Sequence, residues 1–308
     1  MHLIPRTTDG HLQVMIYASL ISRFLLIRLL NRYLVTCGRA LSIFFSLGQT
    51  LPTHRSAHSK HGGIFQPTMA QAIRLLSSQP FSSTTSNSNT SHSLLSSSLK
   101  SLDVADPFTC GTLTYSTNGS DIFTAPSSYT SRRHSWIHVF PEGFIHQHPS
   151  VRMRYFKWGV SRLILESEPL PTIIPMFIAG TENVMPESRT FPRFLPRVGK
   201  KIRIAFGEEV DGDKVFGDLR AKWKRLVVLQ KESIMREGFD AEFPMGELTD
   251  ELKYGTEAVA LRIEVTKRVR AEVLKLRRQL GYPEEEPNAG LVETWAREGQ
   301  QKGEMSVG

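Results

Sequence analysis

The sequence predicts an α/β fold, because short apolar strands alternate with helical segments in the second half of the chain. Two apolar runs have the length and composition of buried strands: residues 136–140, which end at Pro141, and residues 173–178, which end near Gly180. Residues 156–167 lie between them and carry apolar side chains at helical spacing. A strand, a helix and a second strand at this spacing are typical of an α/β sheet.

The remaining elements follow from the same two periodicities. Residues 201–206 alternate and stop at a glycine, which predicts a third strand. Apolar residues at helical spacing predict helices over residues 219–234 and, upstream, over residues 69–76. A stripe of Leu and Val over residues 261–280 lies on a basic helix that stops at Gly281. Such a stripe more often packs into a core or against a partner than around a cofactor.

The composition excludes several classes of protein. A chain of 308 residues with 40% hydrophobic and 22% charged residues is not collagen, a coiled coil or wholly disordered. Cys37 and Cys110 are too few for a disulfide framework or a zinc cluster, so we predict no metal site and a reducing, intracellular setting. The common nucleotide-binding, hydrolase-elbow and zinc-protease motifs are absent from the sequence.

The net charge of +8 is distributed unevenly. Residues 1–60 hold seven Lys and Arg against one Asp, and the other 248 residues contribute only +2. A nucleic-acid binder normally carries its basic patch on the folded domain. Here the positive charge overlaps the most apolar stretch, residues 14–35, which favours an anionic membrane surface and no nucleic-acid partner.

Residues 14–35 predict an interfacial helix and not a membrane span. Arg23, Arg28 and Arg32 interrupt the apolar run, and each would cost at least ~2.5 kcal/mol at the bilayer centre. We therefore assign residues 1–40 as an atypical apolar, Arg-rich segment and a candidate membrane anchor. Its Arg-rich, acid-poor composition also fits a mitochondrial targeting segment. The alternative is a poorly packed or wrongly assigned N-terminus.

Two segments are predicted to lie outside the packed domain. Between Ser82 and Ser101, 13 of 20 residues are Ser or Thr, which cannot bury enough apolar surface to offset ordering. We predict a disordered, low-complexity insertion over residues 80–133 of a domain that spans 41–280. Residues 281–308 are polar and predict a frayed tail.

The sequence Phe140-Pro141-Glu142-Gly143, the FPEG motif, is the strongest candidate for a binding site. It follows a predicted strand directly, at the edge of a sheet where ligands gather. Gly143 would let backbone N–H groups approach an anion, and Glu142 would accept hydrogen bonds from a ligand hydroxyl. Taken by itself, a four-residue string of this kind is equally compatible with an ordinary turn.

The surrounding motifs resemble the tafazzins, phospholipid–lysophospholipid transacylases of the glycerolipid acyltransferase family. The similar blocks are WIHVFPEG at 136–143, MRYFKWG at 153–159 and IIPM at 173–176, preceded by FFSLGQTLPTHR at 44–55 and GIFQP at 63–67. The similarity covers about residues 41–79 and 134–280. It implies an acyltransferase domain over residues 41–280, with a mixed sheet flanked by helices.

The resemblance also implies roles for single residues. Phe140, Pro141, Glu142 and Gly143 match the acyl-acceptor motif, in which the Glu and Gly help to hold the glycerophosphate part of the lipid. Arg55 matches an arginine that binds the lipid phosphate, for which a guanidinium fork is suited. The alternative for Arg55 is a surface charge.

Residues 173–175 match a strand that lines the acyl site in this family, although they would be buried in any case. The implied substrates are phospholipids and lysophospholipids, including cardiolipin species, at a mitochondrial membrane face. No cofactor is implied, neither coenzyme A nor a metal ion. The sequence leaves the oligomeric state and the acyl-chain preference open.

One part of the family pattern is missing. The family uses a His followed five residues later by an Asp as its catalytic base, the HxxxxD motif, and none of the ten histidines here has an Asp at that position. His54, next to Arg55, has Ser59 there. We therefore find no catalytic residues and expect little or no turnover. Two explanations remain. The one we favour is that the sequence starts at the wrong place or lacks an exon. The other is that it belongs to a non-catalytic, peripheral lipid-binding protein.

Overall fold

The computed structural model describes the residues 13–19, 51–54, 56, 59–77, 114–125, 136–143, 147–148, 150–186, 195–238 and 244–296. The strands in these ranges are β1 (Gln13–Ser19), β2 (Thr114–Tyr115), β3 (Phe123–Thr124), β4 (Trp136–Val139), β5 (Thr172–Ala179) and β6 (Arg203–Phe206). The helices are α3 (Pro67–Leu75), α5 (Gly159–Glu166), α6 (Thr181–Val184), α7 (Gly212–Arg236), α8 (Asp250–Tyr254), α9 (Thr256–Gln279) and the 3-10 helix η1 (Pro287–Gly290).

Four of these strands form a mixed sheet in the order β4-β1-β5-β6. β1 runs parallel to both of its neighbours, with Met15 opposite His138 on β4 and Ile174 on β5. β6 is antiparallel to β5 and pairs Phe206 with Met176. The α/β class and the strands predicted near residues 136–140, 173–178 and 201–206 are therefore confirmed.

The strand β1 corrects the expectation for the apolar N-terminal stretch. We predicted an interfacial helix over residues 14–35, whereas residues 13–19 form the strand between β4 and β5. A short apolar run fits a buried strand or a buried helix equally well, and only pairing decides between them. Residues 20–35 lie outside the described part of the chain. Among the helices that are described, none is both long and apolar enough to cross a membrane.

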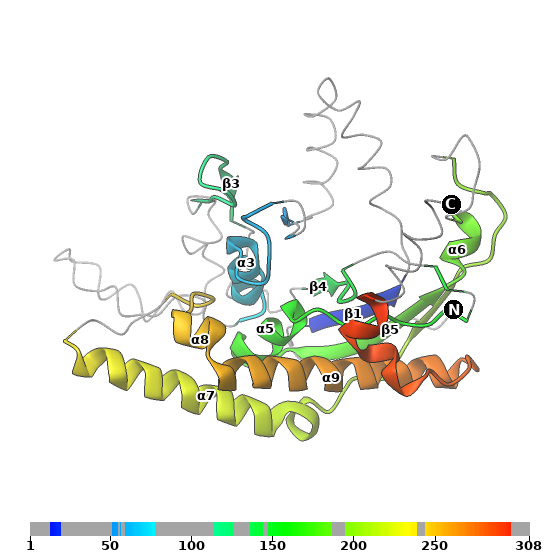
Figure 1. The fold of residues 1–308 in the computed structure, drawn as a ribbon. Coiled ribbons are helices and arrows are strands. Elements are labelled where there is room, and N and C mark those ends of the chain that lie inside the picture. Colours follow the sequence, from blue (N-terminus) through cyan, green and yellow to red (C-terminus); the bar gives the residue numbers. More distant parts are fainter. Residues whose placement is uncertain are drawn as a thin grey trace, which may run out of the picture.

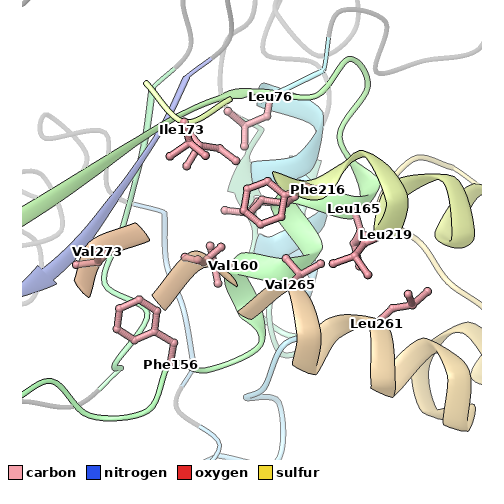
Figure 2. Close-up of a cluster of buried hydrophobic side chains, with 14 of the residues drawn as sticks. Leu76, Phe156, Val160, Leu165, Ile173, Phe216, Leu219, Leu261, Val265 and Val273 are labelled. Atoms are coloured by element: carbon pink, nitrogen blue, oxygen red, sulfur yellow. The ribbon is translucent and has the colours of Figure 1, made fainter. Parts of the chain in front are cut away.

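Helices cover one face of the sheet. α9 packs against β5, α7 packs against α9, and α5 contacts both of these helices (Figure 1). Along β4 and β5, alternate side chains such as Ile137, Ile173 and Phe177 belong to this helical side and join the main core. Figure 2 shows the cluster at its centre, where Val160 and Phe216 meet side chains from α9 and β5.

A buried ion pair on α5 binds two loops to this core through hydrogen bonds to their backbone carbonyls. Arg162 donates from Nε and Nη2 to the two carboxylate oxygens of Glu166, at 2.6 and 2.5 Å. Its Nη1 also donates to the carbonyl of Ile64 at 2.8 Å, and its Nη2 to that of Gly246 at 2.7 Å. Arg262 of α9 is buried nearby and lies over the Phe65 ring, 5.1 Å from its centroid. The loops before α3 and α8 are thus held by charged groups inside the protein.

Part of the predicted insertion is folded. Residues 114–125 form a hairpin in which β2 and β3 pair antiparallel, with Tyr115 opposite Phe123. Thr117 in its turn is buried. The predicted insertion over residues 80–133 therefore contains a structured hairpin, and its Ser/Thr-rich part at 82–101 lies outside the described residues.

The segment after α9 also packs more closely than a frayed tail would. Within residues 281–296, Ala289 of η1 and the side chain of Trp295 are buried. The Trp295 indole Nε1 donates to the carbonyl of Ala289 at 2.8 Å. Residues 297–308 of the predicted polar tail lie outside the described residues.

Candidate functional site

The FPEG motif forms a tight turn at the end of β4. The Gly143 N–H donates to the carbonyl of Phe140 at 3.0 Å, and the carbonyl of Pro141 accepts from the Lys157 N–H at 2.7 Å. Gly143 has a φ of +57°, in the left-handed region that side chains rarely adopt. A Cβ at this position would lie 2.8 Å from Cδ of Lys157. The motif therefore needs glycine for its backbone and for the space that the lysine stem occupies.

Glu142 is the buried member of this turn. Its residue is only 5% exposed, and its Oε2 accepts a hydrogen bond from the Arg154 N–H at 3.0 Å. Burial raises the pKa of Glu142 to about 7, although the Arg154 N–H and the charges of Arg270 and Arg154 act in the opposite direction. Both protonation states of this carboxyl group are therefore populated near neutral pH. It serves as an acceptor when ionised and as a donor when protonated.

The other members of the motif differ in exposure. Pro141 is buried, whereas Phe140 is 45% exposed and Gly143 is exposed. Two arginines of the following segment contact Trp295: the guanidinium groups of Arg152 and Arg154 lie 4.8 and 4.9 Å from its ring centroid. Cation–π contacts of this kind bring the C-terminal segment to the same end of the sheet.

Residues 173–175, the predicted acyl-site strand, lie in the first half of β5. Ile173 and Pro175 are buried, and Ile173 belongs to the main core. Ile174 is partly buried on the opposite face of the sheet, where it packs against Met176 and Ile178. Burial of Ile173 is explained by the core itself, so the acyl-lining role of residues 173–175 stays a prediction.

Arg55, the predicted phosphate ligand, lies outside the described residues, and its role stays a prediction. The residues before it are fixed against the start of α3. The hydroxyl of Thr68 donates to the carbonyl of Pro52, and the His54 N–H donates to Oε1 of Gln66 at 2.8 Å. Pro52 and His54 are thus attached to the start of α3.

A contact between His54 and Asp121 through a hydroxyl was missed by the sequence analysis. The hydroxyl of Thr117 donates to Oδ2 of Asp121, so its oxygen accepts from the Nε2–H of His54, 2.7 Å away. This arrangement leaves Nδ1 of the neutral imidazole unprotonated. Hydrogen bonds from Thr117, Ser116 and Asn118 outweigh the effect of burial and lower the pKa of Asp121 to about 2.

The His-to-Asp spacing of five residues does not describe this pair, because His54 and Asp121 are 67 positions apart in the sequence. The Asn118-Gly119 dipeptide between β2 and β3 is a hairpin signal, but nothing in the sequence places this hairpin beside His54. Within the described part of the chain, no group of three or more His, Cys, Asp or Glu side chains could hold a metal ion.

Comparison with known proteins agrees with the motif pattern. The chain is 35% identical to tafazzin from Saccharomyces cerevisiae over 268 residues, which are 84% of this chain. The chain is homologous to the tafazzins. Shorter matches, each over 26–28% of the chain, join it to taffazin from Dictyostelium discoideum at 37% identity and tafazzin from Drosophila melanogaster at 36%.

The chain also matches a protein that is not named as a tafazzin. It is 36% identical over 81 residues to an N-acylphosphatidylethanolamine synthase from Arabidopsis thaliana. The alignment with the yeast tafazzin covers 60% of that protein, so the chain spans less than two thirds of its length. A search against protein-family profiles finds no match.

Proposed function

We propose that this protein is an O-acyltransferase that moves acyl chains between phospholipids and lysophospholipids, including cardiolipin species. The observation that supports this best is the buried Glu142, set beside Gly143 at the end of β4, in a chain homologous to the tafazzins. Glu142 and Gly143 bind the glycerophosphate part of the acceptor, and Arg55 binds its phosphate. The reaction takes place at a mitochondrial membrane face and requires no coenzyme A or metal ion.

Transfer without the HxxxxD motif needs another base, and His54 is the candidate that the structure offers. Its Nδ1 takes the proton of the acceptor hydroxyl, whose oxygen attacks the acyl carbonyl of the donor phospholipid. The donor glycerol oxygen leaves with the proton from the imidazolium, which yields an acylated acceptor and a lysophospholipid. Asp121 stabilises the imidazolium through Thr117. Because the carboxylate acts only through this hydroxyl, we expect low turnover.

The alternative is a non-catalytic, peripheral lipid-binding protein. Two observations favour it: the HxxxxD motif is absent from the sequence, and apolar side chains are exposed on the sheet. Trp136, Ile204 and Phe206 alternate with strand residues that face the helices, so they lie on the other face, and each is about half exposed. Together with the excess of Lys and Arg in residues 1–60, such a face suits an anionic membrane surface.

Acyl exchange between labelled phosphatidylcholine and monolysocardiolipin in liposomes separates the two functions. We expect low but measurable transfer that Glu142→Ala and His54→Ala each abolish, whereas the exposed control Glu209→Gln leaves it unchanged. Transfer that is absent from the wild type, with liposome binding intact, would establish the lipid-binding alternative. Transfer that survives in Glu142→Ala would contradict the proposed acceptor site.

A further inference from the structure

The segment that holds Glu142 is itself held by arginines of α9. Residues 150–154 follow the FPEG turn and are not part of a strand. Arg277 donates from Nη2 to the carbonyl of Ser150 at 2.8 Å and from Nε to that of Val151 at 3.1 Å. Arg270, seven positions earlier on α9, donates from Nη2 to the carbonyl of Met153 and from Nε to that of Arg154, both at 3.0 Å. The two guanidinium groups thus bind backbone carbonyls that the N–H groups of a neighbouring strand would bind in a sheet.

Glu285, beyond the end of α9, completes this arrangement. Its side chain is 5% exposed, its Oε1 accepts from the Met153 N–H at 2.7 Å, and its Oε2 accepts from Nη2 of Arg270 at 2.5 Å. The peptide group between Met153 and Arg154 is therefore bound at both ends: its carbonyl by Arg270, and its N–H by the carboxylate of Glu142. Glu285 binds the N–H one residue before this peptide, so both residues hold the backbone next to the donor of Glu142.

The same groups set the electrostatic environment of Glu142. The positive charges of Arg154, on its own segment, and of Arg270, on α9, lower the pKa of Glu142, whereas the negative charge of Glu285 raises it. Two further charged residues lie on the same segment: Arg152, which pairs with Glu286 at 3.7 Å, and Lys157 beside Gly143. Glu285 and Arg270 thus have opposite electrostatic effects on the same carboxyl group.

We infer that Glu285 and Arg270 are positioning residues for Glu142, and that the segment after α9 belongs to the acceptor site. This inference rests on the proposed function, in which Glu142 binds the lipid acceptor. The two residues act on the backbone of Met153, Arg270 through its carbonyl and Glu285 through its N–H, and so fix the Met153–Arg154 peptide in the orientation that Glu142 requires. They are positioning and not catalytic residues because their effect on the lipid passes through this peptide and Glu142.

The test measures Glu142 directly and needs no turnover. The titration of its carboxyl carbon is followed by ¹³C NMR, with Glu142→Gln to identify the resonance, and hydrogen exchange of the Arg154 amide is measured in the same samples. Glu285→Gln should lower the midpoint of the titration and speed the exchange roughly tenfold or more. Arg270→Lys keeps the positive charge but loses the planar guanidinium that donates two hydrogen bonds. It should therefore speed hydrogen exchange of the Arg154 amide and leave the titration midpoint of Glu142 closer to that of the wild type.

The matched control is Glu284→Gln, the exposed neighbour of Glu285, which pairs with Arg278 at 2.9 Å. It should change neither quantity. Glu285→Gln values equal to those of this control would overturn the inference; if Glu285→Gln does not fold, unchanged Arg154 exchange in Arg270→Lys would do so. Acyl transfer is assayed separately. A wild type without transfer whose Glu142 still responds to Glu285→Gln contradicts the proposed function and supports the positioning inference.

Discussion

Replacing Glu142 with Gln should change how the stability of the protein depends on pH. Burial raises the pKa of this carboxyl group in the folded state to about 7, from an ordinary value of 4.5. Between these values the folded state binds more protons at this site than the unfolded state, so the free energy of unfolding falls as the pH rises. The difference between the two values corresponds to about 3 kcal/mol. The glutamine variant has no proton to lose and avoids this loss.

The assay is urea unfolding of the wild type and of Glu142→Gln at several pH values between 4 and 8.5. We expect the wild-type free energy of unfolding, relative to that of the variant, to decrease by about 3 kcal/mol as the pH rises from 4.5 to above 7. Taking the difference between the two proteins removes the contribution of the other titrating groups. Glu209→Gln, an exposed carboxylate at the other end of β5, should show a flat difference.

Two results would refute this reasoning. A difference that is flat for Glu142→Gln would mean that Arg154 and Arg270 cancel the effect of burial. A difference that grows with pH would mean that their charges outweigh it and that the carboxylate is ionised throughout the physiological range. Either result would also remove the protonated form of Glu142 as a hydrogen-bond donor to the lipid.

Three further predictions concern packing and can be checked by thermal or urea unfolding. Gly143→Ala should destabilise the protein by about 1–3 kcal/mol through backbone strain and displacement of Lys157. Its control, Gly217→Ala, has open space around the new methyl group inside α7 and should stabilise the protein by about 0.5–1 kcal/mol. Equal effects of the two substitutions would contradict the strain argument. Glu166→Gln leaves Arg162 buried without its charge partner and should cost about 3–5 kcal/mol, and a loss no larger than that of the exposed Glu264→Gln would show that the pair is dispensable. Thr117→Val removes both hydrogen bonds of a buried hydroxyl and should cost about 1–3 kcal/mol, a loss that Thr114→Val on the exposed side of the same hairpin should not reproduce.

Local patterns predicted much of the fold. The helices α3, α5, α7 and α9 and the strands β4, β5 and β6 lie where periodicity placed them. The segment at residues 13–19 was misassigned, because an apolar run of that length carries no periodicity that separates a strand from a helix. Its place between β4 and β5 depends on hydrogen bonds to residues more than 100 positions away.

The candidate site divides in the same way. The sequence by itself determined the FPEG turn, because the strand, the proline and the glycine that shape it are contiguous. Only the tertiary structure decided what surrounds Glu142: its burial, the Arg154 N–H that binds it, and the contacts of Arg270 and Glu285 with the backbone of Met153. It likewise brought Asp121 to His54. Contacts between residues far apart in the sequence, such as Met153 with Arg270 and Glu285, leave no periodic signal, since they depend on how whole helices and hairpins pack and not on the spacing of neighbouring side chains.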